Sequence, residues 1–271
     1  MATSSGRTPH VGHFVAWDGG CMLIGRAASV IPVHAHYATQ IAFGSTTGIA
    51  FRGDESEAWT EYAGAIIPSR APHAMDATRV GPSATLLIEP ETREGRALAE
   101  RHLRGGIAPI PDAALAEVGP ALFSAWMEQR SLAAVADAAQ RVVRVLAGGV
   151  APSFVSDERI LRATQYIRSH LDARLTLDVV ASEACLSPSR FRHLFVEQTG
   201  MGLQPYILWR RMLHVWSLLT AGGSLSAAAH EAGFADAAHL SRTSRAMFGF
   251  PPSAVQFAEP LPADTERRAS S

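Results

Sequence analysis

The sequence predicts an α+β protein, in which an antiparallel β-barrel with trailing helices precedes an all-α domain of two helix-turn-helix units joined by a long helix. Short apolar runs separated by Gly, Pro, Ser and Asp fill residues 20–89. Ala- and Leu-rich segments with helical periodicity follow up to residue 149. From residue 157 onward, a pattern of short capped helices occurs twice. A chain of 271 residues is long enough for two such domains.

The composition is typical of a globular protein, with 47% hydrophobic and 18% charged residues. No run of about 18 uncharged apolar residues could cross a bilayer, and no apolar segment of a secretory signal follows the first ten residues. Cys21 and Cys185 are too few for a disulfide framework. We therefore expect a cytoplasmic protein with no membrane partner.

The basic residues of the chain are all Arg, and their distribution is uneven. Residues 156–258 contain ten Arg against eight acidic residues, an excess of two, together with five His. This is a weak indication of nucleic-acid binding, because a binding protein concentrates charge on one face rather than in its total. Composition alone does not identify DNA as the partner.

The first half of the chain divides into strands and then helices. The strands are expected at Met22–Ala27, Gln40–Phe43, Gly48–Phe51 and Ala84–Glu89, and the helices at Arg96–Leu103, Ala113–Arg130 and Leu132–Leu146. Gly148–Ser153 combines two Gly with a Pro, which favours a linker. We place the first domain at 10–150 (barrel about 10–90, helices about 91–148), the second at 151–260 and a disordered tail at 261–271.

The second half contains a repeated pair of helices. In the first copy, Thr176 is the expected N-cap of a short helix, and Ser187 followed by Pro188 begins the next. In the second copy, Ser224 and Asp236 occupy the matching positions, at offsets of 48 and 49 residues. Two short helices separated by a turn of about three residues are typical of a helix-turn-helix unit.

The second helix of each unit has one apolar and one polar face. In the first copy Phe191, Leu194 and Phe195 share a face, opposite a polar stripe. The outward residues of the two copies are Ser189, Arg190, Arg192 and His193, and then Ala238, His239, Arg242 and Arg245. A single such stripe is usually a solvated surface, but its repetition favours a common partner. Residues 206–220 form a longer helix that would hold the two units at a fixed distance, as successive major grooves about 34 Å apart require.

Residues 157–256 resemble the DNA-binding domain of the AraC/XylS family of transcription regulators. The matching positions are Leu186–Phe195, Gly200, Arg211, Leu218–Leu219, Ala229, Gly233–Phe234, Leu240–Arg242 and Gly249–Ser253. The resemblance implies a transcription regulator rather than an enzyme, with double-stranded DNA and RNA polymerase as partners. Three positions depart from the family pattern: His193 replaces an Arg, Ser244 an aromatic core residue, and Gln256 the closing Arg.

The chemistry of each outward residue suggests its role on DNA. Arg192 and Arg242 are the candidates for base edges, because Arg can bind guanine O6 and N7 with two hydrogen bonds. Ser189, His193 and His239 are weaker candidates for base contacts. The remaining arginines, Arg190, Arg210, Arg211 and Arg245, are expected to contact phosphate or nearby acidic residues, and Arg211 is alternatively an internal strut.

The N-terminal module resembles the cupin barrel in its two motifs, Pro32–His36 and Gly64–His73. His34 and His36 alternate on a strand and point the same way, and His73 could join them as a three-imidazole metal site. The usual fourth ligand of a metal cupin is Glu, and here it is Gln40, a poor ligand for a divalent cation. We therefore assign these four residues to an effector pocket, with no metal and no cofactor, and keep the metal site as the alternative.

Three hypotheses for function follow. The first is a regulator that responds to an unidentified small-molecule effector in the barrel; the second is a metal-dependent cupin enzyme fused to a DNA-binding domain; the third is a constitutive DNA-binding protein. No catalytic residues are assigned, because the sequence has neither a Gly-rich phosphate loop before a Lys nor a nucleophile elbow.

Residues 111–147 resemble the dimerising segment of the family, with candidate homodimer contacts at Leu122, Trp126, Leu132 and Val135; packing against the barrel is the alternative.

Overall fold

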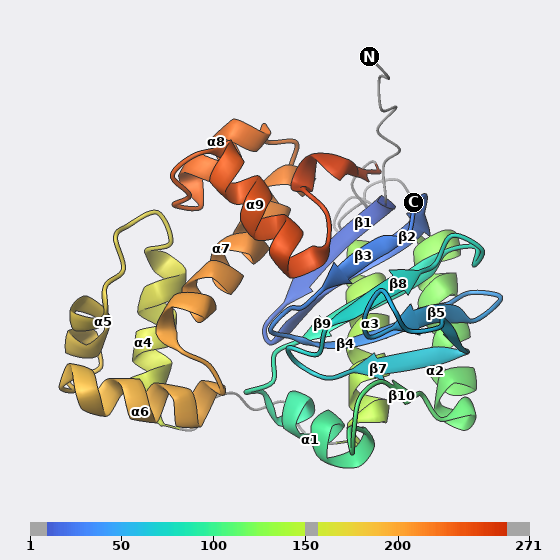
Figure 1. Ribbon diagram of the computed structural model, residues 1–271, viewed down its shortest axis with the longest axis horizontal. Helices are drawn as coiled ribbons and strands as arrows, with labels where there is room; N and C mark the ends of the chain where they lie inside the picture. Colours follow the sequence, from blue (N-terminus) through green and yellow to red (C-terminus); the bar gives the residue numbers. More distant parts are fainter. Residues whose placement is uncertain (1–9, 150–156, 259–271) are drawn as a thin grey trace, which may run out of the picture.

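The computed structural model describes residues 10–149 and 157–258 (Figure 1). Its strands form two sheets. The larger sheet has the order β10 (Ala108–Pro109), β7 (Gly64–Ile67), β4 (Thr39–Gly44), β9 (Ser83–Ile88), β2 (Gly20–Ala27), β1 (His10–Trp17) and β11 (Val255–Phe257). The smaller has the order β3 (Ile31–His34), β8 (His73–Asp76), β5 (Ile49–Arg52) and β6 (Thr60–Tyr62). The predicted antiparallel module is confirmed, as two facing sheets.

Alternation of side chains along the strands creates two cores. In β2, Met22 and Ile24 lie on the face of the larger sheet that packs against helices, whereas Cys21 and Leu23 point to the space between the sheets. That inner space also receives Phe51 of β5 and Met75 of β8. Each face of the larger sheet is therefore buried.

The helices that follow the strands cover the outer face of the larger sheet. They are α1 (Arg93–His102), α2 (Asp112–Ser124), which continues as a π-helical turn over Ala125–Gln129, and α3 (Leu132–Leu146). Pro120 lies inside α2. Leu122 and Val135 are fully buried in the core beneath these helices, so packing against the sheet accounts for them, whereas Leu132 is 41% exposed.

The second half consists of α4 (Glu158–Ser169), α5 (Leu177–Glu183), α6 (Pro188–Thr199), α7 (Leu203–Thr220), α8 (Leu225–Glu231) and α9 (Ala237–Phe248), with a short 3-10 turn over Pro252–Ala254. The four predicted N-caps are confirmed: Thr176, Ser187, Ser224 and Asp236 each accept a hydrogen bond from a backbone N–H in the first turn. No helix in the two described ranges is long and apolar enough to cross a membrane.

The two halves of the chain pack closely together. Helix α7 runs alongside the sheets in Figure 1, and the C-terminal end of α9 contacts β3. Strand β11 follows the last helical turn and pairs in parallel with β1, so that the end of the helical half becomes the edge strand of the larger sheet. Most of the predicted linker and the predicted tail, residues 150–156 and 259–271, lie outside the described residues.

Candidate DNA interface and effector pocket

Helix α6 presents the polar stripe predicted from the sequence. Ser189, Arg190, Arg192 and His193 are all exposed, whereas the apolar residues predicted for the opposite face, Phe191, Leu194 and Phe195, are buried. Pro188 at the first helical position and Gly200, with φ of 75° at the C-cap, fix the two ends of this helix. The helix therefore offers one arginine-bearing face to a partner.

Helix α9 has the corresponding face in the second unit. Ala238, Arg242 and Arg245 are exposed and His239 is half-buried, with its ring 5.3 Å from that of Phe234. Leu240 is fully buried on the opposite side. The structure thus places all eight predicted contact residues on two helices, one in each unit, that are joined by α7.

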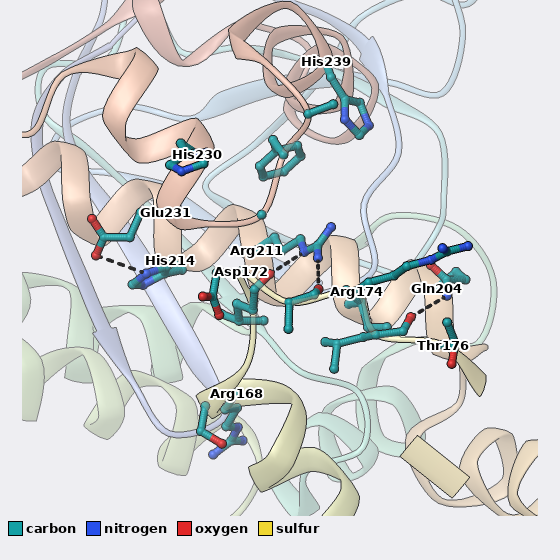
Figure 2. Close-up of a pocket in the computed structure, with 18 of the residues that line it drawn as sticks. Arg168, Asp172, Arg174, Thr176, Gln204, Arg211, His214, His230, Glu231 and His239 are labelled. Carbon is teal, nitrogen blue, oxygen red and sulfur yellow. Dashed lines mark hydrogen bonds and ion pairs between the residues drawn. The ribbon is translucent and has the colours of Figure 1, made fainter. Parts of the chain in front are cut away.

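The space between the two units is a cleft of about 1400 Å³ (Figure 2). Arg211 of α7 crosses it to the loop before α5, donating from Nε to the Leu171 carbonyl at 2.9 Å and from Nη2 to the Ala173 carbonyl at 2.9 Å. Gly233 in the turn of the second unit lies against the same guanidinium and carbonyl. Arg211 is therefore the internal strut that the sequence left as an alternative to a phosphate contact.

The unusual serine of the second unit is accommodated by a hydrogen bond and by neighbouring rings. Ser244 is fully buried, and its hydroxyl donates to the Phe250 carbonyl at 2.7 Å. The rings of Phe248 and Phe250 lie 5.7 and 6.1 Å from that of Trp216, measured between centroids. These two aromatic residues fill the core beside the position where the family pattern has its own aromatic residue.

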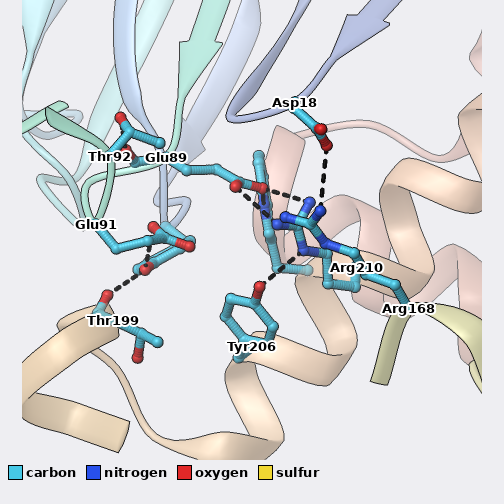
Figure 3. Close-up of polar contacts among 10 residues, drawn as sticks. Asp18, Glu89, Glu91, Thr92, Arg168, Thr199, Tyr206 and Arg210 are labelled. Atoms are coloured by element: carbon cyan, nitrogen blue, oxygen red, sulfur yellow. Dashed lines mark hydrogen bonds and ion pairs between the residues drawn. The ribbon is translucent and has the colours of Figure 1, made fainter. Parts of the chain in front are cut away.

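A buried ion pair joins the two halves of the chain (Figure 3). Arg210 of α7 binds Glu89, which follows β9, through two contacts: Nη1 to Oε1 at 2.7 Å and Nη2 to Oε2 at 2.8 Å. Trp209 donates to Oε1 of the same carboxylate at 3.1 Å, and the Arg210 Nε donates to the Tyr206 hydroxyl at 3.1 Å. Glu89 is 0% and Arg210 8% exposed, so Arg210 pairs with an acid and is not available to phosphate. Sequence analysis missed this pair; an acidic residue at the end of an apolar run was its only signal.

Further polar contacts surround the ion pair. The Tyr37 hydroxyl contacts Oε2 of Glu91 at 2.8 Å and the Thr199 carbonyl. Burial, reinforced by the charge of Glu89, raises the pKa of Glu91 to about 8. Arg96 donates to the Gln198 carbonyl at 3.0 Å. The first helix-turn-helix unit is thus attached to the N-terminal half through Tyr37 and through Arg96 of α1.

The four predicted pocket residues meet between the sheets. His34, His36 and His73 lie with ring centroids 4.3–5.6 Å apart, and Gln40 Oε1 is 2.8 Å from His36 Nε2. Burial, with a smaller contribution from the neighbouring imidazoles, lowers the pKa of His34 to about 4 and that of His73 to about 2. Burial also lowers the pKa of His36. All three imidazoles are therefore neutral at pH 7.

The helical half of the chain covers this pocket. A cavity of about 30 Å³ is lined by His34, His36 and Gln40, by apolar residues of both sheets, and by Phe248 and Phe250. That volume corresponds to roughly one water molecule. A larger molecule would fit only after the two phenylalanines had moved.

Comparisons with known proteins agree with this geometry. Residues 180–257 match the family model described as "Helix-turn-helix domain". The arabinose operon regulatory protein of Escherichia coli is 34% identical over 99 residues, which are 36% of this chain and 34% of that protein. The C-terminal domain is an AraC-type helix-turn-helix domain. The regulatory protein PocR of Salmonella typhimurium is 30% identical to the chain over 101 residues, 37% of this chain and 33% of PocR. The chain thus spans about a third of the length of the curated relatives it matches.

The architecture of both halves together is found in ToxT of Vibrio cholerae. The apo form of that protein has a TM-score of 0.56 and 10% identity, with 88% of this chain and 97% of ToxT covered. At this identity the likeness establishes the fold alone: a sheet-rich N-terminal half followed by a helical domain with helix-turn-helix units.

Proposed function

We propose that this protein is a sequence-specific DNA-binding transcription regulator, acting in the cytoplasm, whose N-terminal pocket binds a small-molecule effector. The observation that carries the proposal is the exposure of one arginine-bearing helix in each unit of the AraC-type domain, α6 and α9, with their apolar faces buried around α7. A rigid pair of such helices suits two successive major grooves of one duplex.

Arg192 and Arg242 are the proposed base-contacting residues, one in each unit. Both are exposed near the middle of their helices, and neither forms an ion pair with an acid among the described residues. Arg190 lies in the first turn of α6, where a guanidinium and the helix N-terminus together favour phosphate. Contact with RNA polymerase and homodimer formation remain predictions.

We call a DNA sequence that the protein enriches from sheared genomic DNA the selected site. We expect Arg192→Ala and Arg242→Ala each to weaken binding to the selected site by about 1–3 kcal/mol and to relax base preference in different half-sites. Arg190→Ala should weaken binding to all DNA sequences alike and reduce the salt dependence of binding. Affinities for the site and for mutated half-sites, at several salt concentrations, test this prediction. Arg141→Ala is the charge-matched control, since Arg141 lies on α3 and pairs with Glu117 at 3.1 Å. A uniform loss of affinity in all three variants contradicts the assignment of base contacts.

The pocket supports regulation because its cover belongs to the DNA-binding domain. An effector larger than a water molecule would displace Phe248, the last residue of α9, and Phe250, which follows the C-cap of that helix. Effector binding and the docked position of α9 would then exclude one another, which couples the two sites thermodynamically. ToxT, which shares the fold, has been solved with an unsaturated fatty acid bound, a precedent for a small molecule in this architecture.

The experiment that tests the proposal is selection of sheared genomic DNA by the purified full-length chain, followed by sequencing. We expect enriched sites with two short conserved blocks about one helical turn apart. Retention of DNA without sequence preference would contradict a sequence-specific regulator. The same assay with Arg192→Ala/Arg242→Ala should lose the enrichment while retaining salt-sensitive binding.

A further inference from the structure

Side chains of the N-terminal half bind the C-terminal end of α6, the helix that carries the polar stripe of the first unit. The last carbonyls of a helix have no partner within the helix and need donors from elsewhere. Three consecutive carbonyls at this end each contact such a donor: Gln198 with Arg96 at 3.0 Å, Thr199 with the Tyr37 hydroxyl, and Gly200 with Arg70. The docked N-terminal half therefore fixes the end of a helix that faces the DNA.

The Tyr37 hydroxyl lies between two oxygen atoms from opposite sides of this interface. One is the Thr199 carbonyl, and the other is Oε2 of Glu91 at 2.8 Å (Figure 3). A phenol has one proton to donate, and a carbonyl oxygen only accepts. If Glu91 were a carboxylate, one of the two oxygens would face the phenol oxygen without a proton between them. If Glu91 is a carboxylic acid, it donates to Tyr37, and Tyr37 donates to Thr199.

The charges around Glu91 also favour its neutral form. Glu91 is 3% exposed and interacts with the like charge of Glu89. The Arg210 guanidinium is engaged by Glu89 and the Tyr206 hydroxyl, and its attraction for Glu91 is weaker than the opposing effects of burial and of Glu89. Burial raises the pKa of Tyr206 to about 12 and also raises that of Tyr37, so both phenols are neutral at pH 7.

We propose that Glu91 is a neutral carboxylic acid when the two halves are docked, and that loss of its proton weakens their docking and releases the end of α6. Ionisation removes the donor that Tyr37 accepts from and places a second negative charge beside Glu89. Separation of the halves relieves both effects, because water then hydrates the carboxylate. Docking is therefore coupled to one proton. The consequence for DNA binding rests on the proposed function, whereas the coupling itself does not.

The docked protein holds the Glu91 proton more tightly than the separated protein does. The pKa of Glu91 is about 8 in the docked protein, against an ordinary value of 4.5 in water. The docked state therefore has its full advantage below about pH 4.5 and loses it as the pH rises through about 8. Between pH 7 and pH 8 these two pKa values correspond to a fall of about fivefold in the docking equilibrium constant.

The other titratable groups near the interface keep one charge state between pH 7 and pH 8. The three pocket histidines are neutral when docked, and in water their ordinary pKa of about 6.5 leaves them largely neutral above pH 7. Cys21 has an ordinary pKa of 9.0, which burial raises further. Arg168 of α4 and Arg210 of α7 remain cationic. A pH dependence in this window is therefore specific to Glu91.

Infrared difference spectra of the full-length chain at pH 7 and pH 9 test the protonation of Glu91. We expect the C=O stretching band of a carboxylic acid at pH 7, its loss at pH 9, and its absence at both values in Glu91→Gln. Glu100→Gln is the matched control, because Glu100 is exposed on α1, and it should keep the band. A wild-type spectrum at pH 7 without a band that Glu91→Gln removes would overturn the proposal.

Chemical unfolding at pH 7 and pH 8 tests the coupling. The unfolding equilibrium constant should rise about fivefold more in the wild type and in Glu100→Gln than in Glu91→Gln, whose amide donates to Tyr37 at either pH. Glu91→Met is a second neutral variant if Glu91→Gln does not fold. An equal pH dependence in the wild type and the neutral variant would overturn the coupling.

Affinity for the selected site separates this proposal from the proposed function. We expect the change in affinity between pH 7 and pH 8 to be larger in the wild type than in Glu91→Gln, because only the wild type loses a proton at the interface. Equal changes would overturn the effect of docking on DNA binding. Failure of the genomic selection would leave the infrared band and the pH dependence of unfolding as they are, so the two proposals fail independently.

Discussion

Glu89→Ala is expected to destabilise the docked protein by about 3–5 kcal/mol, because it leaves the Arg210 guanidinium buried without its carboxylate. Arg210 is 8% exposed and has two contacts to Glu89, at 2.7 and 2.8 Å. The domains can relieve this cost by separating, since separation returns Arg210 to water. The loss in the free energy of unfolding is therefore limited to the free energy of docking. Chemical unfolding should show a lower midpoint or two separate transitions, and small-angle scattering a larger radius of gyration.

The double variant Glu89→Ala/Arg210→Met is the matched control for this prediction. It removes both charges and keeps an apolar side chain of similar length, so it should recover most of the lost stability. Asp18→Ala is a second control, because the Asp18 side chain is 76% exposed and its ion pair with Arg168 should contribute at most about 1 kcal/mol. If Glu89→Ala cost no more than Asp18→Ala, the buried pair would not hold the domains together.

Separation of the domains would also expose the effector pocket. Glu89→Ala should therefore mimic the effector in its influence on DNA binding, shifting affinity for the selected site in the same direction, because both release α9 from β3. An effector that still changed the DNA affinity of Glu89→Ala by the wild-type factor would contradict the coupling.

Gly233→Ala is expected to cost about 2–5 kcal/mol in the stability of the second helix-turn-helix unit. Gly233 has φ of 73°, a conformation that costs an L-residue about 1–2 kcal/mol. A Cβ there would also lie 2.2 Å from the Leu171 carbonyl and 2.8 Å from Arg211 Nη2. The clash would push apart the turn and the strut between the two units, and overpacking of this kind typically adds about 1–3 kcal/mol. Thermal unfolding and affinity for the selected site measure the effect.

Gly222→Ala separates the two parts of that cost. Gly222 has φ of 87°, but a Cβ added there would meet no atom of the described residues within 4 Å, so the substitution carries the backbone cost alone. We expect a loss of about 1–2 kcal/mol with little change in base preference. Equal losses for the two glycines would mean that the contact of the turn with Leu171 and Arg211 does not determine the stability of the unit.

Several features followed from short stretches of sequence. The four helix caps, the repeat of the two units and the inward apolar faces of α6 and α9 were all predictable, because each depends on residues within a few positions of one another. The convergence of His34, His36, Gln40 and His73 was predicted from strand alternation together with the cupin resemblance.

The tertiary structure decided what these elements contact. A sequence pattern indicates that a side chain is buried, but not against which distant segment. Arg210 was expected to contact either DNA phosphate or a nearby acidic residue. In the structure it forms an ion pair with Glu89, 121 residues earlier in the chain. Phe248 and Phe250 lie in the core of the second unit and also cover the pocket. Strand β11 pairs with β1 at the other end of the described chain. These contacts form only when two separately patterned halves dock, since docking removes apolar surface and one ion pair from water together.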